Sequence, residues 1–468
     1  MEVFFTMIRN NPNIKGLEIF GLNYLLTAYA DDSSFFPKDL KSVHEIFNTF
    51  SLFSKYSGLK ANVSKCEIAG IGAKNGAQVA LLGLKNINLN EEAMRILGVH
   101  FSYNSNIFKE KNFHDVIIKM ERTLSVWRWR NLSLAGKITI FKTLAFSQII
   151  PISFLSSTPN IIIDKIEELQ KDFIWNGKTP KIKHSTLISD YSDGGLKDVD
   201  IKSKFKSLKL GWLRRLFSVD FHPWKNIPLK MIEQSFGQNI FFPNTKISPP
   251  VNIPMFYKDI ISYWSELKQN PLTAESVLMQ PIWFNQYILV NNLPIKKLFP
   301  FALFVSDLIN ENGTFLNWET FKNKFNLENR NFFKWRQMIS AIPSEWKEKI
   351  GSHAPLQLPV LQHTLQLTRS IPLSKLTSKQ VYLIFLHKIK KPPTSQLKIR
   401  NLLSNQILKW DELYVFGRQI AIDSYSRMFH YKCTQNILFL NRALFRMNIV
   451  SSPLCSYCQM NEETIIIF

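Results

Sequence analysis

Cysteine is scarce in this sequence, whose 468 residues contain four: Cys66, Cys433, Cys455 and Cys458. So few and so unevenly spaced cysteines do not build a disulfide framework in a chain of this length, which favours a reducing compartment. Acidic residues are also few, 36 against 58 lysines and arginines, and the formal net charge is +22. This charge predicts a polyanionic partner, either nucleic acid or an acidic membrane surface. A basic surface without a partner is the alternative.

The sequence predicts neither a secretory signal nor a membrane span. Only a six-residue, largely apolar run separates Glu2 from Arg9, which is too short for a signal peptide. The uncharged stretch from Thr143 to Ile163 has the length of a spanning helix, but Pro151 and Pro159 predict two helix breaks within it. We therefore expect no membrane span and an intracellular protein, nuclear or cytoplasmic.

The stretch from Leu25 to Phe36 predicts a β-hairpin with two neighbouring aspartates at its tip. Apolar residues precede Asp31 and Asp32, small polar residues follow, and the apolar pattern then resumes. Two adjacent carboxylates repel each other, so a fold that holds them close needs a cation, and magnesium suits an all-oxygen site completed by substrate phosphates. Plain turn chemistry is the alternative, because any exposed turn can carry two aspartates.

This hairpin is the first of several blocks that occur in the order of one known family. Tyr29-Ala30-Asp31-Asp32 resembles the metal-binding box of reverse transcriptases of non-LTR (LINE-type) retrotransposons. The resemblance is densest from about residue 14 to residue 212 and returns near the C-terminus. The later blocks that resemble the family are Phe50 to Glu67, Ile96 to Phe101, Leu132 to Lys137, Phe173 to Gly177 and Gly194 to Leu196.

The resemblance implies an α+β, mainly α fold: a partial right-hand polymerase palm followed by a helical thumb. In the palm, the hairpin would be covered by a helix from Lys38 to Tyr56, whose apolar spacing is helical and which Gly58 caps. Asp31 and Asp32 would be catalytic and would bind magnesium. Lys60 and Lys65 would lie near the incoming nucleotide and contact its phosphates, and a solvated loop is the alternative for each lysine.

One feature of the family is missing before the hairpin. An earlier strand of the family's palm supplies another metal-binding aspartate, whereas the carboxylates that precede Asp31 here are Glu2 and Glu18. Phosphoryl transfer by two metals needs carboxylates from more than one strand. We therefore expect a truncated reverse transcriptase that is inactive as given. Half a palm sheet would also leave an unpaired strand edge, so failure to fold stably is a further alternative.

From Lys109 onward the sequence changes to basic, amphipathic helices with interleaved aromatic residues. This pattern is typical of a helical thumb that holds a duplex by its phosphates without reading its sequence. For each single lysine a solvated helix face is the alternative. The predicted nucleic-acid-binding residues are Lys119, Arg122, Arg128, Arg130, Lys137 and Lys142, and a second basic cluster comprises Lys197, Lys202, Lys204, Lys206, Lys209, Arg214 and Arg215.

The tail carries a Cys-x-x-Cys pair, Cys455 and Cys458. In the family, histidine and cysteine follow such a pair and complete a four-ligand zinc knuckle, but this sequence ends before either appears. His430 and Cys433 are candidates to complete the zinc site, and two reduced thiols are the alternative. The expected parts are a partial palm (1–108), a helical thumb (109–220), a connector of helices and loops without legible chemistry (221–400), and a helical C-terminal region with an incomplete zinc-knuckle-like tail (401–468).

The resemblance therefore implies a truncated RNA-directed DNA polymerase of a non-LTR retrotransposon. Its expected partners are an RNA template and an RNA:DNA hybrid or DNA, which it would bind without extending a primer. The alternative is a non-catalytic, basic nucleic-acid-binding protein derived from a retroelement.

Overall fold

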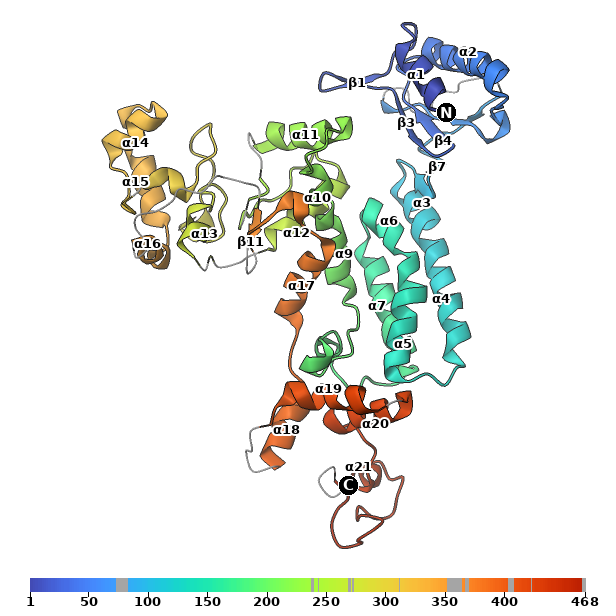
Figure 1. Ribbon diagram of the computed structural model, residues 1–468, viewed down its shortest axis with the longest axis vertical. Coiled ribbons are helices and arrows are strands. Elements are labelled where there is room, and N and C mark those ends of the chain that lie inside the picture. The colour runs from blue at the N-terminus through green and yellow to red at the C-terminus, as the bar shows by residue number, and fades with distance from the viewer. Residues whose placement is uncertain are drawn as a thin grey trace. The chain divides into compact units, whose positions relative to one another are not determined.

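The structure is a computed structural model that describes residues 1–72, 83–236, 240–242, 244–267, 271, 273–310, 312–351, 364–366, 370–402, 408–421 and 423–464. The chain forms two compact units, and each is discontinuous in sequence. Unit 1 comprises Met1–Asn112 and Leu210–Thr377, and unit 2 comprises Phe113–Lys209 and Ser378–Phe468. The described residues are mainly helical, as the sequence predicts (Figure 1).

The N-terminal part of unit 1 packs two helices against short strands. Helix α2 (Leu40–Ser57) begins where the Asp39 side chain accepts a hydrogen bond from the Ser42 amide, and it ends at Gly58, whose φ is +71°. Phe4 of α1 (Glu2–Asn10) lies 5.1 Å from Phe50 and 5.5 Å from Phe53, measured between ring centres. The helix with its glycine cap is confirmed, and its aromatic residues form the core beneath the hairpin.

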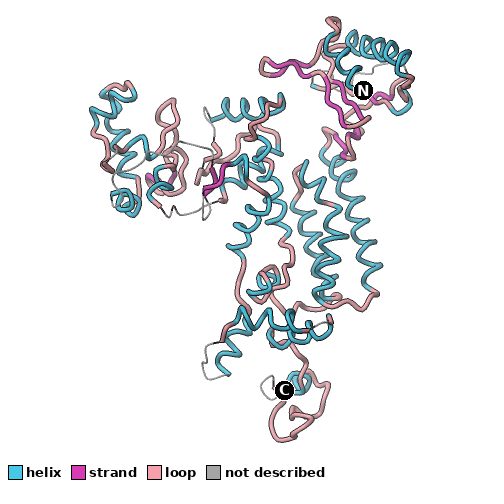
Figure 2. Tube along the Cα trace, in the orientation of Figure 1, coloured by secondary structure: helices cyan, strands magenta, loops and turns pink. Residues whose placement is uncertain are grey.

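Within the described residues the strands pair two by two, in six separate ribbons (Figure 2). The multi-stranded palm sheet that the resemblance implies is not formed by these strands, so a polymerase palm stays a prediction. The strands are β1 (Leu17–Ile19), β2 (Leu22–Tyr24), β3 (Leu26–Tyr29), β4 (Asp32–Phe35), β5 (Glu67–Ile68), β6 (Lys85–Asn86), β7 (Met94–Ile96), β8 (Val99–Phe101), β9 (Leu289–Val290), β10 (Leu293–Pro294), β11 (Thr364–Gln366) and β12 (Ser370–Pro372).

The later part of unit 1 is built around aromatic side chains. Trp283, Phe321 and Trp346 are fully buried in one apolar cluster. This packing role explains why tryptophan and phenylalanine recur in a segment that has no recognisable catalytic or binding motif. Its helices, with the short α3 that follows β8, are α3 (Ser105–Lys109), α10 (Leu213–Leu216), α11 (Asn226–Phe236), α12 (Met255–Ser265), α13 (Ala274–Leu278), α14 (Trp318–Phe325), α15 (Phe332–Ala341) and α16 (Ser344–Gly351).

Unit 2 is a helical bundle in which α4, α5 and α7 lie side by side (Figure 1). Ion pairs join α4 to α7 at two levels, Glu121 with Lys165 and Arg128 with Asp172, so these two helices run parallel. The helices of the unit are α4 (Asp115–Arg128), α5 (Leu134–Ile140), α6 (Ile150–Leu155), α7 (Asn160–Trp175), α8 (His184–Leu187), α9 (Ile201–Gly211, in this unit as far as Lys209), α17 (Ser378–Ile389), α18 (Thr394–Leu402), α19 (Trp410–Ile420), α20 (Ser424–Thr434) and α21 (Asn441–Arg446).

The uncharged stretch from Thr143 to Ile163 is interrupted in the structure. A π-helical turn up to Ala145 and a 3-10 turn precede α6, Pro151 lies in the first turn of α6, and Pro159 caps α7 after a non-helical link. Of the helices that the structure describes, none is long and apolar enough to cross a membrane.

The segment Gly194-Gly195-Leu196 lies in the first sequence segment of unit 2 and is hydrogen-bonded to the second. The Gly194 carbonyl oxygen accepts hydrogen bonds from Tyr431 Oη, at 3.3 Å, and from Gln435 Nε2, at 2.9 Å. Gly194 has a φ of +78°, and a Cβ on Gly195 would lie 2.0 Å from the backbone oxygen of Ser189. Both positions therefore require glycine, and the block that resembles the family serves packing here.

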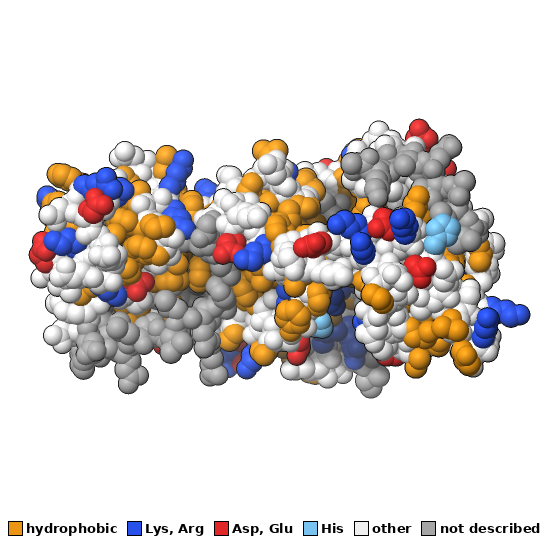
Figure 3. Space-filling view, turned by 90° about the horizontal axis from the view of Figure 1, so that it is seen from above, with side chains coloured by type: hydrophobic (Ala, Val, Ile, Leu, Met, Phe, Trp, Pro, Cys, Tyr) orange, Lys and Arg blue, Asp and Glu red, His pale blue; other side chains and the backbone are white. Residues whose placement is uncertain are grey.

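Part of the positive charge is balanced locally. On the face in Figure 3, acidic side chains lie among basic ones. Lys230 pairs with Glu233 at 2.9 Å and Lys322 with Glu319 at 2.8 Å on their helices. A polyanion would therefore be attracted most strongly where cations lack such acidic neighbours.

Candidate functional site

The two aspartates lie at the tip of a β-hairpin, as predicted. Strands β3 and β4 are antiparallel and pair Tyr29 with Asp32, which leaves Ala30 and Asp31 as a two-residue turn. Ala30 has a φ of +54°, a conformation that costs a residue with a side chain on the order of 1 kcal/mol. Both aspartates are exposed. The hairpin thus presents two carboxylates to solvent on a turn whose backbone is strained.

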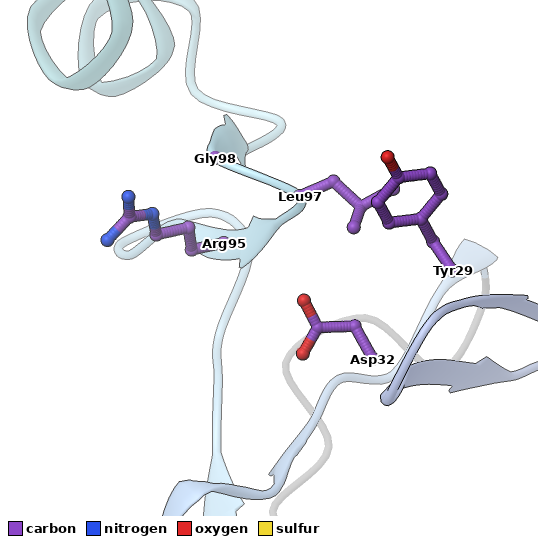
Figure 4. A pocket seen from close by; sticks show the side chains of 5 residues that line it. All are labelled: Tyr29, Asp32, Arg95, Leu97 and Gly98. Carbon is purple, nitrogen blue, oxygen red and sulfur yellow. The ribbon is translucent and has the colours of Figure 1, made fainter.

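The tip of this hairpin faces the tip of a second one. The turn between β7 and β8 contains Leu97 and Gly98, with φ values of +47° and +84°. Between the two tips is an open depression of about 580 Å³, lined by Tyr29, Asp32, Arg95, Leu97 and Gly98. In Figure 4 the Tyr29 ring faces Leu97, the Asp32 carboxylate points into the space, and Arg95 extends away from it.

This geometry gives the two aspartates different positions. Asp32 lines the depression, whereas Asp31 occupies the turn and is not among its lining residues. In the part of the chain that the structure describes, no three histidine, cysteine, aspartate or glutamate side chains are close enough to share a metal ion. Magnesium does not need a full protein cage, because it keeps several waters and takes phosphate oxygens as ligands. An exposed carboxylate such as Asp32 fits that mode, and magnesium binding stays a prediction.

The predicted phosphate ligands lie elsewhere in unit 1. Lys60 follows the C-terminal cap of α2, and Lys65 ends a 3-10 turn that begins at Val63; both are exposed. Neither lines the depression, and the cation beside it is Arg95. The sequence motifs did not identify Arg95, because the block that resembles the family begins one residue later, at Ile96. The strand pattern of β7 could have identified it, since this pattern places Arg95 close to the turn between β7 and β8.

The predicted nucleic-acid-binding residues of unit 2 divide into two groups. Lys119, Arg122 and Arg130 are exposed on α4 and just beyond its end. Arg128 is also exposed, and its guanidinium pairs with Asp172 on α7. Such cations can approach phosphates in the way that the sequence predicts.

Lys137 and Lys142 are turned toward the protein. The Lys137 ammonium donates to the Asn176 side chain and to the Ile174 carbonyl oxygen at 3.4 Å, and its pKa is lowered by burial and by the charge of Arg128. The Lys142 ammonium donates to the Lys197 carbonyl oxygen at 2.6 Å, and burial lowers its pKa too. Both side chains have structural partners in unit 2.

Members of the second basic cluster that lie in unit 2 also have partners. Lys202 pairs with Asp164 at 3.4 Å and with Glu167 at 3.1 Å. The Lys204 ammonium lies 5.6 Å from the centre of the Tyr382 ring, and Lys209 is only 2% exposed. Lysines at helical spacing on α9 thus join this helix to its neighbours.

The two cysteines of the tail pair differ in burial. Cys455 is buried, while Cys458 is half-buried and its pKa is lowered, mainly by hydrogen bonds from the backbone amides of Met460 and Asn461. Amides that stabilise a thiolate also favour a thiolate ligand of zinc. The His430 ring lies 5.9 Å from that of Phe416, and burial raises the pKa of Cys433. Zinc binding stays a prediction.

Comparison with known proteins relates the chain to transposable elements. No protein-family model matches it. Over 300 residues, 61% of this chain, it is 23% identical to the "Transposon TX1 uncharacterized 149 kDa protein" of Xenopus laevis and covers 22% of that protein. Over 109 residues, 21% of this chain, it is 28% identical to a "Putative ribonuclease H protein" of Arabidopsis thaliana and covers 17% of that protein.

The chain thus spans about a fifth of the length of the curated relatives that it matches. These similarities point to a retroelement protein, in agreement with the broader part of the resemblance drawn from the sequence blocks.

Proposed function

We propose that the chain is part of a reverse transcriptase of a non-LTR retrotransposon. In this proposal the β3–β4 hairpin supplies carboxylates to a nucleotidyl-transfer site, and unit 2 binds an RNA template, an RNA:DNA hybrid or DNA. The observation that carries the proposal is the exposed carboxylate of Asp32, which points into an open depression between two hairpin tips. The similarity to a transposon protein supports it.

The chemistry of the depression suits a magnesium-bound phosphate. Asp32 would supply a carboxylate oxygen to magnesium, with Asp31 adjacent in the turn, and phosphate oxygens and water would complete the six ligands that magnesium takes. Tyr29 is 71% exposed at the rim, where its ring could contact a sugar or a base. These residues would bind and orient the phosphates of a nucleic-acid end.

We further propose that this chain binds nucleic acid without extending a primer. The two carboxylates that precede the hairpin in the sequence lie on other elements. Glu2 pairs with Arg9 on α1 at 2.6 Å, and Glu18 lies on β1. Two metal ions that clamp the attacking and leaving oxygens need carboxylates that converge from separate strands. A hairpin that supplies Asp31 and Asp32 alone would hold one metal ion.

The test measures binding of a primer annealed to an RNA template, with and without magnesium. Magnesium is expected to tighten binding by the unchanged chain and to have less effect on the Asp32→Asn variant. Asp115→Asn is the matched control, because it also removes one exposed carboxylate, 68% exposed on α4, but belongs to unit 2 and not to the hairpin. Equal magnesium effects in all three proteins would contradict a role for the hairpin.

A primer-extension assay with deoxynucleotides tests the second part. No extension is expected from this chain. Extension that disappears in Asp31→Asn would overturn the proposed inactivity and would leave the polymerase assignment in place.

A basic nucleic-acid-binding protein derived from a retroelement is the second candidate. The exposed cations Lys119, Arg122 and Arg130 favour it, because they need neither the hairpin nor magnesium. Charge reversal at Arg128 and Arg130, compared with replacement of Asp31 and Asp32 by asparagine, separates the two candidates. If only the arginines affect binding, the second candidate is preferred.

A further inference from the structure

A tryptophan at the end of α4 is almost fully exposed. Trp129 is 90% exposed and follows the last residue of α4, between Arg128 and Arg130. A fully exposed indole presents a large, flat ring to solvent, where it can stack on the ring of a partner. Its two neighbours are cations, so the partner that best fits this position is both aromatic and anionic.

Several elements meet at this end of unit 2. Because α4 and α7 run parallel, their C-terminal ends lie together, and α5 starts beside them (Figure 1). One apolar cluster includes Leu134 at the start of α5, Ile174 at the end of α7, Ile182 in the following loop and Tyr431 on α20. Residues that flank the members of this cluster are therefore brought to the same end of the bundle.

Cations are concentrated around this cluster. The ammonium of Lys181, next to Ile182, lies 3.2 Å from the centre of the Phe439 ring. Burial lowers the pKa of Lys181, and so do the charges of Lys432 and Lys178, which means that the Lys181 ammonium group is repelled by both neighbours. An anion placed among like charges relieves this repulsion. The C-terminal ends of α4 and α7 carry partial negative charge, which helps to hold cations there in the absence of an anion.

We propose that this end of unit 2 binds single-stranded nucleic acid, with the Trp129 indole stacked on an unpaired base and Arg130, Lys178 and the Lys181–Lys432 pair in contact with its phosphates. The inference deepens the proposed function and depends on it. A single strand fits better than a duplex, because an exposed indole needs the face of a base, and in a duplex both faces are covered by neighbouring pairs. Stacking tolerates any sequence, so sequence preference is expected to be weak.

The test compares an oligothymidine with a DNA duplex of the same length, measured by fluorescence anisotropy of labelled nucleic acid. For Trp129→Ala, binding of the oligothymidine should weaken roughly five- to a hundredfold, the range expected for the loss of one stacked base, while duplex binding changes little. Trp129→Phe, which keeps a smaller ring, should give an intermediate loss. Because Trp129 is exposed, all variants should melt at the temperature of the unchanged protein.

Phe333→Ala is the matched control, since Phe333 is a 78% exposed aromatic residue of unit 1 and should not affect either probe. A Lys181→Glu and Lys432→Glu double variant should weaken binding of both probes and reduce the salt dependence. If Trp129→Ala binds the oligothymidine normally, or loses both probes equally, the stacking inference is wrong. If the unchanged chain binds neither of these probes nor a primer annealed to an RNA template, the proposed function itself fails.

Discussion

Asp198 has a buried carboxylate whose two oxygens differ in their hydrogen bonding. It is 3% exposed, and its Oδ1 accepts hydrogen bonds from Gln170 Nε2 at 2.9 Å and from the Val199 amide at 2.8 Å. Among the described residues its Oδ2 has no hydrogen-bond partner, and His184 Nδ1 lies 3.7 Å away. Burial raises the pKa of Asp198, although the charges of His184 and Lys142 and both hydrogen bonds oppose the rise.

This raised pKa makes the stability of unit 2 depend on pH. The folded protein binds the proton of Asp198 more tightly than the unfolded chain, whose pKa is near 3.8. The resulting stabilisation is complete below that value and is lost as the pH rises through the folded-state pKa. Asp198→Asn keeps an oxygen for both hydrogen bonds and cannot ionise. The variant should therefore gain stability relative to the unchanged protein as the pH is raised from acid to neutral.

Thermal melting across that pH range measures this difference. Glu168→Gln is the control, because the Glu168 side chain is 69% exposed and its removal should give a difference that varies little with pH. A constant gap between the unchanged protein and Asp198→Asn would mean that burial does not perturb this carboxyl group.

The residue scale also shows what the sequence could not predict. The pattern of basic residues placed Lys119, Arg122, Lys137 and Lys142 on equal terms, although the first two are exposed and the last two donate to groups inside the unit. A lysine carries a long apolar stem with one charged group, so the sequence alone does not say which way it turns. The acidic turn could be predicted, because apolar residues on both sides of Asp31 and Asp32 fix a hairpin by local pattern.

At the scale of elements, the loop that contains Gly194 and Gly195 holds the C-terminal helices against the bundle. The Gly194 amide donates to the Tyr191 carbonyl oxygen at 3.1 Å, and the Gly195 amide donates to that of Asp190 at 2.9 Å. The guanidinium of Arg418, on α19, lies 3.5 Å from the centre of the Tyr191 ring. Packing at this loop therefore couples α19 and α20 to the earlier part of unit 2.

Gly195→Ala should weaken this coupling. The new Cβ would lie 2.0 Å from the Ser189 backbone oxygen, so backbone as well as side chains must move. Overpacking of this kind costs about 1–3 kcal/mol in the free energy of unfolding. Gly136→Ala is the matched control, because Gly136 lies in α5 and its Cβ would be 3.4 Å from its nearest neighbour, the hydroxyl of Ser133, which is a side-chain atom. Alanine favours a helix, so this control should stabilise by up to about 1 kcal/mol.

Urea unfolding followed by circular dichroism measures both changes. Equal stability of the two glycine variants would contradict the close approach at Gly195. Proteolysis provides a second measure, since weaker docking of α19 and α20 should make cleavage near the C-terminus faster in Gly195→Ala than in Gly136→Ala.

Element-scale prediction from sequence succeeded where the signals were local. The hairpin and the glycine cap of α2 follow from residues close in sequence. The docking of α20 on Gly194 joins residues more than two hundred positions apart, and a single sequence contains no periodicity that reports such a contact. The expected parts divided the chain linearly, whereas each compact unit combines an early and a late segment.

At the scale of the whole molecule, a net charge of +22 predicts binding that depends strongly on salt. Each phosphate that a lysine or arginine neutralises releases a condensed counterion, so the logarithm of affinity falls linearly with the logarithm of salt concentration. If about six phosphates are contacted, affinity for a duplex should fall about a thousandfold between roughly 50 and 200 mM salt.

The slope of log affinity against log salt concentration gives the number of phosphate contacts. Variants that change this slope show which residues make the contacts. Replacing both Lys119 and Arg122 by alanine should reduce the slope by about two, because each exposed cation on α4 accounts for about one phosphate. Lys322→Ala combined with Arg330→Ala is the control for net charge: it removes two cations from unit 1, and each of these already has an acidic neighbour. If the two double variants change the slope equally, binding follows net charge alone. A larger effect at Lys119 and Arg122 would mean that α4 contacts the phosphates directly, as a helical thumb requires.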